Sequence, residues 1–347
     1  MIVTVTANPS LDLTYVLPHK AAPGVEVQRA LTATLEASGK GVNVSRALTA
    51  ADRATYAVLP VGGAVGRHVL ELLDAAGVPY GAVPVGGSTR VNTSVLQPGG
   101  RTLKLNGPGS VMSAIDEEAV LVTVEAAVRA APTDGQTWLA ICGSLPPGVD
   151  ASFVVRLVQA AHAVGARCAV DTSGPALAVA LAAGADLLAP NAAELFEVSA
   201  GARTAGTDPV ALPSAVTALA AQTGCQLLVS LGAAGALWTD GVQCLRASGP
   251  ALTPVNTAGA GDALAGWLAR GRRGPSDPAG ARSPLGALGM SGPYYRRPSA
   301  RAWRPWPGSG RGRHGRHCPL AAVVLTRRAR ENQVMDISRT AASPSTN

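Results

Sequence analysis

The feature that most restricts the fold is a repeated alternation of short apolar runs with helical segments over the first 270 residues. The predicted strands cover residues 3–7, 57–60, 137–142, 167–171, 187–188 and 226–230. The predicted helices cover residues 41–51, 65–76, 150–164, 177–183, 192–200 and 212–223. Such alternation indicates an α/β protein whose mostly parallel sheet carries helices on both faces. Ligands of these sheets bind at the carboxyl ends of the strands.

Two segments do not follow this alternation. Residues 14–35 and 89–106 are richer in threonine, valine and polar residues, and they favour short strands that pair with each other. Two small strand sets inserted into an α/β core are typical of a lid over an active site. We therefore expect a small β-sheet lid beside the main domain.

Composition excludes several protein classes. Hydrophobic residues make up 47% of the 347 residues, so a core of alanine, valine and leucine is feasible, yet no apolar run is long enough to cross a bilayer. Residues 1–6 resemble a buried strand and not a signal peptide. The cysteines are scattered and odd in number, which predicts free thiols in a cytoplasmic protein. They are Cys142, Cys168, Cys225, Cys244 and Cys318.

The net charge of +7 has an uneven origin. Residues 1–270 contain 15 basic and 19 acidic residues, whereas residues 271–347 contain 14 arginines and three acids. A basic tail alone favours sequence-independent nucleic-acid binding, but the acidic domain makes that function the weakest hypothesis. The tail is rich in arginine, glycine and proline and keeps no hydrophobic period, so we expect disorder or an out-of-frame reading beginning near residues 270–275.

The segment Asn256-Thr257-Ala258-Gly259-Ala260-Gly261-Asp262 carries the strongest chemical signal. Its glycines allow the main-chain amides to form an anion cradle where the following helix begins. Asp262, beside that cradle, is suited to accept a proton from a hydroxyl while the amides hold a developing phosphoryl charge. Taken alone, a Gly-x-Gly-Asp element favours a helix-capping turn, and only the other motifs of the chain reverse that interpretation.

Two further motifs lie near the N-terminus. Gly39-Lys40-Gly41-Val42-Asn43 lacks Walker-loop spacing, but Lys40 and Asn43 offer donors to an anionic or polyhydroxy ligand. Asp12, which ends the segment from Asn8 to Asp12, is suited to accept hydrogen bonds from sugar hydroxyls. A turn or cap is an equally good interpretation of Asp12 in isolation.

Taken together, the motifs resemble those of the ribokinase-like pfkB family of carbohydrate kinases. The matching elements are Asn-Pro-x-Leu-Asp (8–12), Gly-Lys-Gly-x-Asn-Val (39–44), Gly-Ser-Leu-Pro (143–146), Asn-x-x-Glu (191–194), Ser-Leu-Gly-x-x-Gly-Ala (230–236) and Gly-Ala-Gly-Asp (259–262). The resemblance spans roughly residues 1–270 and implies a three-layer α/β sandwich with a β lid. It also implies an ATP-dependent kinase that uses Mg²⁺ and forms a homodimer through the lid.

The resemblance implies a role for each matching residue. Asp262 resembles the catalytic base, and the amides of Gly259, Ala260 and Gly261 resemble the anion hole. The implied sugar contacts are Asp12, Gly39 and Asn43, and the implied substrate-phosphate contacts are Lys40, Arg90, Asn92, Ser144 and Lys104, where an exposed lid lysine is the alternative for Lys104. The implied nucleotide contacts are Ser230, Gly232, Gly235 and Asn256. Asn191 and Glu194 match an element associated with Mg²⁺, and a plain helix cap is compatible with that role.

The motif variants point to a phosphosugar substrate. Gly-Lys-Gly-x-Asn-Val and Thr89-Arg90-Val91-Asn92 resemble the 1-phosphofructokinase branch, which implies conversion of fructose 1-phosphate to fructose 1,6-bisphosphate. Tagatose 6-phosphate and fructose 6-phosphate are the alternative substrates. Ala189 stands where the family usually has lysine, and the tail departs from the family pattern. A weakened or inactive sugar-phosphate-binding homologue is therefore a further hypothesis.

Overall fold

The computed structural model describes residues 1–247, apart from 22–23, 25 and 133–134, together with Arg304–Pro305. Its main sheet has the strand order β14-β13-β12-β11-β10-β9-β8-β1-β4-β5. The strands are β1 (Ile2–Val5), β4 (Thr55–Val61), β5 (Tyr80–Pro84), β8 (Trp138–Cys142), β9 (Arg167–Asp171), β10 (Leu187–Leu188), β11 (Gln226–Ser230), β12 (Ala236–Thr239), β13 (Cys244–Ala247) and β14 (Arg304–Pro305). Neighbours from β5 to β11 are parallel, and the pairs from β11 to β14 are antiparallel. The predicted mostly parallel sheet is confirmed.

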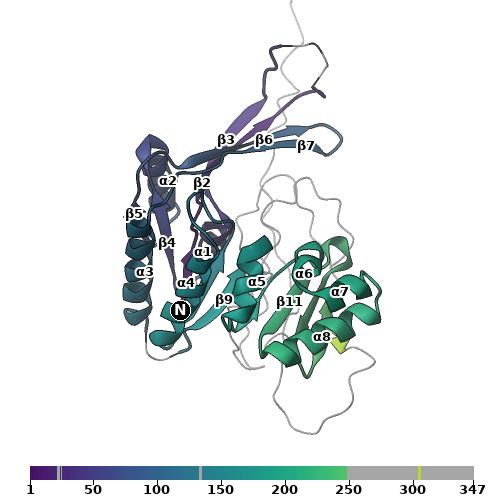
Figure 1. Cartoon of the computed structure of the whole chain (residues 1–347). Coiled ribbons are helices and arrows are strands. Elements are labelled where there is room, and N and C mark those ends of the chain that lie inside the picture. Colours follow the sequence, from purple (N-terminus) through teal and green to yellow (C-terminus); the bar gives the residue numbers. More distant parts are fainter. Residues whose placement is uncertain (22–23, 25, 133–134, 248–303, 306–347) are drawn as a thin grey trace, which may run out of the picture.

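Helices cover both faces of this sheet (Figure 1). On one face lie α1 (Lys40–Ala50) and α2 (Gly63–Ala75). The other face is covered by α3 (Ala114–Arg129), α4 (Ser152–Ala163), α5 (Gly174–Ala182), α6 (Ala192–Val198), α7 (Ala200–Ala205) and α8 (Ala211–Thr223). Alternate residues of β1 face opposite layers, since Val3 packs in the α3–α4 core and Ile2 packs with Val44 and Leu48 of α1. The fold is a three-layer α/β sandwich.

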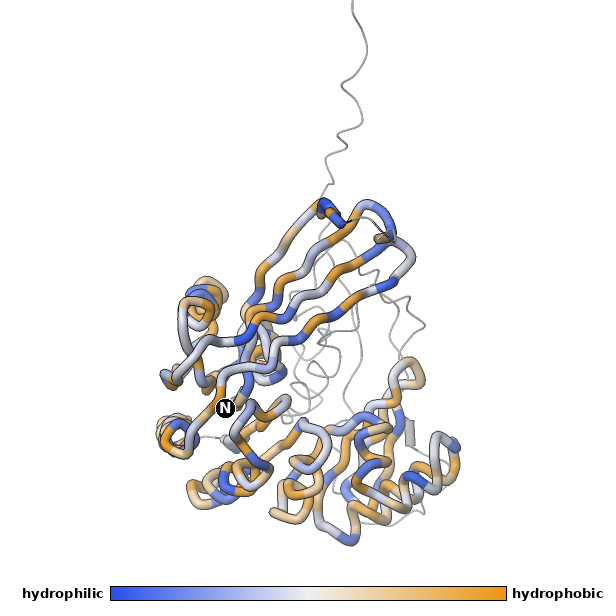
Figure 2. The backbone as a smooth tube through the Cα atoms, turned by 45° about the horizontal axis from the view of Figure 1, so that its top comes forward, coloured by the Kyte–Doolittle hydropathy of each residue, from blue (hydrophilic) through white to orange (hydrophobic). Residues whose placement is uncertain are grey.

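A second, four-stranded sheet projects from this core, and we call it the lid sheet (Figure 1). Its order is β3 (Thr32–Ser38), β2 (Ser10–Val16), β6 (Arg90–Gln97) and β7 (Arg101–Asn106). Polar and apolar residues alternate along these strands (Figure 2), so the lid sheet has one polar and one apolar face. The predicted pairing between the two inserted segments is confirmed, although the first begins at Ser10 and ends at Ser38.

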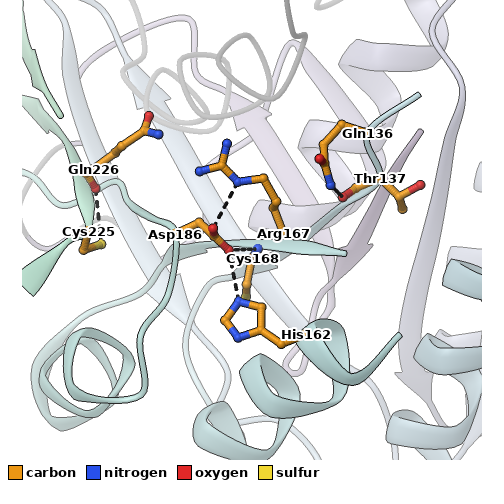
Figure 3. A network of polar contacts seen from close by, with 8 residues as sticks. All are labelled: Gln136, Thr137, His162, Arg167, Cys168, Asp186, Cys225 and Gln226. Carbon is orange, nitrogen blue, oxygen red and sulfur yellow. Dashed lines mark hydrogen bonds and ion pairs between the residues drawn. The ribbon is translucent and has the colours of Figure 1, made fainter. Parts of the chain in front are cut away.

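A polar network joins the amino ends of β9, β10 and β11, opposite the edge where ligands of such sheets bind (Figure 3). The Asp186 carboxylate accepts hydrogen bonds from Arg167 Nε at 3.0 Å and from the Cys168 amide at 2.8 Å, and it lies 3.0 Å from His162 Nε2. Arg167 also stacks on the Trp138 ring. The position of this network and its contacts with β9, β10 and β11 indicate a structural role. The four cysteines among the described residues form no disulfide, which agrees with the predicted thiols, and all four are buried.

Three parts of the structure differ from the sequence prediction. The helix predicted for 192–200 is interrupted at Ser199, whose extended backbone ends α6 and whose hydroxyl caps α7 through the Ala202 amide. Helix α3 was not predicted, because its valines at 120, 122 and 124 alternate as they would in a strand. The strands β5, β12 and β13 were not predicted either.

Candidate active site

The Gly39–Asn43 segment begins α1 at the carboxyl end of β1. A Cβ at Gly41 would lie 2.5 Å from Thr6 Oγ1 and 2.9 Å from Val5 O, and Gly39 has a φ of +123° that favours glycine. The Val42 amide donates to Thr6 Oγ1 at 2.9 Å. These glycines therefore allow the start of α1 to approach the strand end closely, which fixes the backbone of Lys40. Asn43 lies one turn further along α1, where its amide donates to Gly39 O.

Asp12 is held on the polar face of the lid sheet. Its Oδ1 accepts a hydrogen bond from Ser10 Oγ at 2.7 Å and another from Asn92 Nδ2 at 3.0 Å. Asn92 Nδ2 also donates to Ser10 Oγ at 2.9 Å. Asp12 and Asn92 are directly opposed in the parallel β2–β6 register, so the strand pairing sets this geometry. The carboxylate keeps a second oxygen for a ligand hydroxyl.

Arg90 lies at the base of the lid sheet, opposite Ser10. Its guanidinium donates to Asn8 O at 2.8 Å and to Gly107 O at 3.3 Å. Burial lowers the pKa of Arg90, and the nearby Asp12 carboxylate opposes that shift. An arginine retains its charge under such a shift. The site therefore holds a fixed positive charge close to Asp12.

Two atoms of this cluster lack hydrogen-bond partners. Arg90 Nε and Asn92 Oδ1 are buried and unpartnered, and the other such side-chain atoms among the described residues are Thr49 Oγ1 and Arg53 Nε. Buried polar groups are nearly always satisfied, so each exception calls for an explanation. One unpaired donor and one unpaired acceptor next to Asp12 suit a ligand that carries both an anionic group and a hydroxyl.

Lys40 and Asp171 form an ion pair at the carboxyl ends of the strands. Lys40 Nζ donates to Asp171 Oδ1 at 2.7 Å, and 131 residues separate them in sequence. Asp171 ends β9, and sequence reasoning did not select it. The available signal was an acidic residue that directly follows a buried apolar strand, since this is the edge at which α/β proteins bind ligands.

Ser144 and Lys104 are the remaining residues that the motifs assign to the substrate phosphate. Asn8 Nδ2 lies 3.5 Å from Ser144 Oγ, which brings the turn after β8 against the segment that carries Asp12. Lys104 is exposed on β7 opposite Ser94, and it shares the polar face with Asn92 but lies further out on the lid sheet. Asp12, Lys40, Arg90, Asn92 and Ser144 thus belong to one neighbourhood, and Lys104 borders it.

Asn191 and Glu194 form a reciprocal capping box at the start of α6. Glu194 N donates to Asn191 Oδ1 at 2.9 Å, and Asn191 N donates to Glu194 Oε2 at 2.8 Å. Ser230 N donates to Pro190 O, which ties this turn to the end of β11. The cap uses one oxygen of each side chain and leaves the other carboxylate oxygen of Glu194 available.

The loop after β11 borders a cavity of about 300 Å³. Asn191, Ser230, Gly232 and Arg246 are among the residues that line it. Gly232 and Gly235 have φ values of +57° and +101°, so the loop conformation favours glycine at both positions. Arg246, which no motif predicted, adds a cation to the lining.

The segment with the strongest sequence signal lies outside the described residues. It contains Asn256, Gly259, Ala260, Gly261 and Asp262. Residues 271–347, apart from Arg304–Pro305, lie outside them as well. Within the described residues, no group of three or more His, Cys, Asp or Glu side chains is arranged to hold a metal ion.

Comparison with known proteins decides the family. The model of the "pfkB family carbohydrate kinase" matches residues 6–273. The chain belongs to the pfkB family of carbohydrate kinases. A 1-phosphofructokinase of Rhodobacter capsulatus is 34% identical over 299 residues, which are 84% of this chain and 92% of that protein. The ATP-dependent 6-phosphofructokinase isozyme 2 of Escherichia coli strain K12 is also 34% identical, over 77% of this chain and 84% of that one.

Solved structures of pfkB kinases have the same architecture. The crystal structure of phosphofructokinase-2 from E. coli in complex with fructose 6-phosphate superposes with a TM-score of 0.68 and 32% identity. The superposition covers 77% of this chain and 85% of that one. The pfkB match makes this chain a phosphotransferase that uses ATP and a carbohydrate hydroxyl as acceptor. No helix among the described residues is long and apolar enough to span a membrane.

Proposed function

We propose that this pfkB kinase transfers the γ-phosphoryl group of ATP to fructose 1-phosphate and forms fructose 1,6-bisphosphate. The observation that carries the proposal is the pair of unsatisfied buried atoms next to Asp12. Arg90 Nε suits a phosphate oxygen, and Asn92 Oδ1 suits a sugar hydroxyl. A phosphosugar supplies both groups, whereas an unphosphorylated sugar leaves the buried arginine nitrogen without an acceptor.

Asp262 is the proposed general base. It takes the proton of the acceptor hydroxyl as that oxygen bonds to the γ-phosphorus, and the bond from that phosphorus to the bridging oxygen breaks to release ADP. The amides of Gly259, Ala260 and Gly261 stabilise the charge on the transferring group. Asp12, Gly39 and Asn43 hold the sugar hydroxyls, while Lys40, Arg90, Ser144 and Lys104 surround its phosphate. Asn92 lies between the two groups, with its Oδ1 assigned to a hydroxyl. This assignment rests on the family motifs and on the neighbourhood that the described residues form.

The nucleotide side is proposed at the loop after β11. Ser230, Gly232 and Gly235, together with Asn256, are assigned to ATP, and the cavity beside this loop supports the assignment. The donor set also fits Mg²⁺, because Glu194 keeps a free carboxylate oxygen and this ion commonly uses one or two carboxylates, phosphate oxygens and waters. Bound there with Asn191 nearby, the ion would neutralise charge on the phosphates.

A coupled ADP-release assay tests the proposal. The acceptors are fructose 1-phosphate, fructose 6-phosphate, tagatose 6-phosphate and fructose. We expect the highest kcat/KM with fructose 1-phosphate and almost no ADP release with fructose. A preference for either 6-phosphate would reassign the substrate within phosphosugars. Equal rates with fructose and its phosphates would contradict the proposed role of Arg90.

A weakened kinase is the second candidate function, and Ala189 favours it because the family usually has lysine there. We further propose that the arginine-rich residues 271–347 arise from a frameshift, a proposal supported by the end of the family match at residue 273. Tight phosphosugar binding with little turnover would support the weakened kinase. Peptides of this tail in the mass spectrum of the natural protein would contradict the frameshift.

We also propose that two copies associate through the apolar face of the lid sheet. Four large apolar side chains are exposed there, and they are Leu35, Val91, Leu103 and Leu105. Burial of such a patch against its own copy removes apolar surface from water. Light scattering should give a dimer for the wild type and a monomer for Leu105→Asp, whereas Ile115→Asp on α3 should remain dimeric. A monomeric wild type would contradict the proposal.

A further inference from the structure

The Lys40–Asp171 ion pair is strongly asymmetric in its exposure. The Asp171 side chain is 7% exposed, whereas the Lys40 side chain is 37% exposed. A buried carboxylate requires a partner, because removal of its cation leaves an uncompensated charge at low dielectric. The carboxylate is therefore the fixed member of the pair, and the ammonium is the member that reaches the solvent-accessible side.

The main chain on both sides of the pair is fixed by other contacts. Gly143 N donates to Asp171 O at 2.8 Å, and Thr172 Oγ1 donates to Gly143 O at 2.9 Å, so the ends of β8 and β9 are locked together. A Cβ at Gly143 would lie 3.7 Å from Lys40 Cβ, so the Lys40 stem lies against this turn. What remains to be fixed is the rotation of the Lys40 side chain, whose several torsions make it flexible.

Within the pair, the ammonium of Lys40 compensates the negative charge of the Asp171 carboxylate. Lys40 lies next to the Gly143–Ser144 turn, and Ser144 lies against the Asn8 segment whose carbonyl holds Arg90. An anionic substrate on this edge would meet the Asp171 carboxylate, which repels it unless a cation compensates that charge. Lys40 supplies this compensation in the observed geometry.

We propose that Asp171 is a positioning residue, which holds the ammonium of Lys40 toward the phosphate of the acceptor sugar. The inference rests on the proposed function and adds to it a residue that no motif selected. In this proposal Asp171 acts through Lys40 and does not itself contact the substrate. Without Asp171 the lysine loses the ion pair that orients its ammonium, and without Lys40 the carboxylate repels the phosphosugar.

A double-mutant cycle tests this coupling. It compares wild type, Asp171→Asn, Lys40→Met and the double variant in KM for fructose 1-phosphate and for ATP. Asp171→Asn should raise the phosphosugar KM about tenfold, equivalent to about 1.4 kcal/mol, and leave the ATP KM nearly unchanged. Lys40→Met should raise it further, and the double variant should bind the sugar better than Lys40→Met because the repelling charge is gone. The proposal would be overturned if the increases in phosphosugar KM of the two single variants multiplied in the double variant. A rise in the ATP KM alone would also overturn it.

A second measurement does not depend on turnover. The chain has three lysines, Lys20, Lys40 and Lys104. Trace acetylation followed by peptide mass spectrometry therefore compares the acetylation rate of Lys40 with those of two internal references. Lys40 should react more slowly than both in the wild type, and it should become faster in Asp171→Asn while Lys20 and Lys104 stay unchanged. An unchanged Lys40 rate would overturn the proposal even in an active enzyme. An inactive wild type with the expected labelling would contradict the proposed function and retain the pairing.

Discussion

Asn92 donates a hydrogen bond of 3.0 Å to the Asp12 carboxylate across two parallel strands of the lid sheet. The two residues are register partners, so the sheet itself holds the carboxylate in place. The same bond leaves the carbonyl oxygen of Asn92 buried and without a partner. A substrate hydroxyl is the proposed partner of this oxygen.

Asp12→Ala should therefore lower kcat/KM for the phosphosugar about a hundredfold. The loss corresponds to about 2–3 kcal/mol, which is typical of a hydrogen bond to a charged group whose removal leaves buried partners unsatisfied. Steady-state kinetics with fructose 1-phosphate measures it. Thr14→Ser, two residues further along the same face, is the matched control and should retain wild-type kinetics. Equal activity of the two variants would show that Asp12 does not contact the substrate.

Arg90→Lys should raise the phosphosugar KM by about tenfold or more, because lysine retains the charge but cannot reproduce the fork of donors. Binding of fructose 1-phosphate, measured by calorimetry, should weaken to a similar extent. Arg101→Lys, at the exposed start of β7, is the control and should bind as the wild type does. A variant with unchanged affinity would remove Arg90 from the phosphate site.

Gly41→Ala should destabilise the fold. The added methyl group would lie 2.5 Å from Thr6 Oγ1 and 2.9 Å from Val5 O, so either α1 or β1 must shift. Overpacking of this kind costs about 1–3 kcal/mol. Gly201→Ala in α7 meets nothing within 4 Å and should be neutral or slightly stabilising. Thermal unfolding followed by circular dichroism compares them, and equal melting temperatures would contradict the close approach.

Asp186 should make the fold sensitive to acid. Burial raises the pKa of this carboxyl, but hydrogen bonds from the Cys168 amide, His162 and Arg167 outweigh burial and leave the pKa below its usual range. Its stabilisation is thus present above the unfolded-state pKa of about 4, and it is lost as the pH falls through the lower folded-state pKa. Denaturant unfolding of Asp186→Asn should show lower stability at pH 7 and a weaker dependence on pH below about 4.

The control for that measurement is Glu71→Gln. The Glu71 side chain is 71% exposed, and its ion-pair partner within the described part of the chain is His68. Its pH dependence of stability should match that of the wild type. If Asp186→Asn also follows the wild-type curve, the network at the amino ends of the strands does not contribute to acid sensitivity.

Local patterns were sufficient to predict the central strands of the main sheet, from β4 through β1 to β11, and most helices. Val3 and Val5 form a run that only a buried strand accommodates, and the turn at Gly39 marks the start of α1. Local patterns were not sufficient to predict α3. There the tertiary packing of Val120 and Val124 outweighs the strand preference of β-branched residues.

The same limit applies to the candidate site. Motif spacing selected Asp12, Arg90 and Asn92, which the lid register brings together. It did not select Asp171, because the pairing with Lys40 depends on the order of β8, β9 and α1 in space. Arg246 was missed for a related reason, since it joins the cavity wall only through the antiparallel β12–β13 pair.

The proposed role of Asp262 as the proton acceptor gives the most direct test of the whole account. Single-turnover transfer from radiolabelled ATP to fructose 1-phosphate is measured for the wild type and for Asp262→Asn. We predict formation of fructose 1,6-bisphosphate by the wild type and a rate about a thousandfold lower in the variant, with phosphosugar affinity retained. Equal transfer rates in the two proteins, or no bisphosphate from a wild type that binds both substrates, would contradict it.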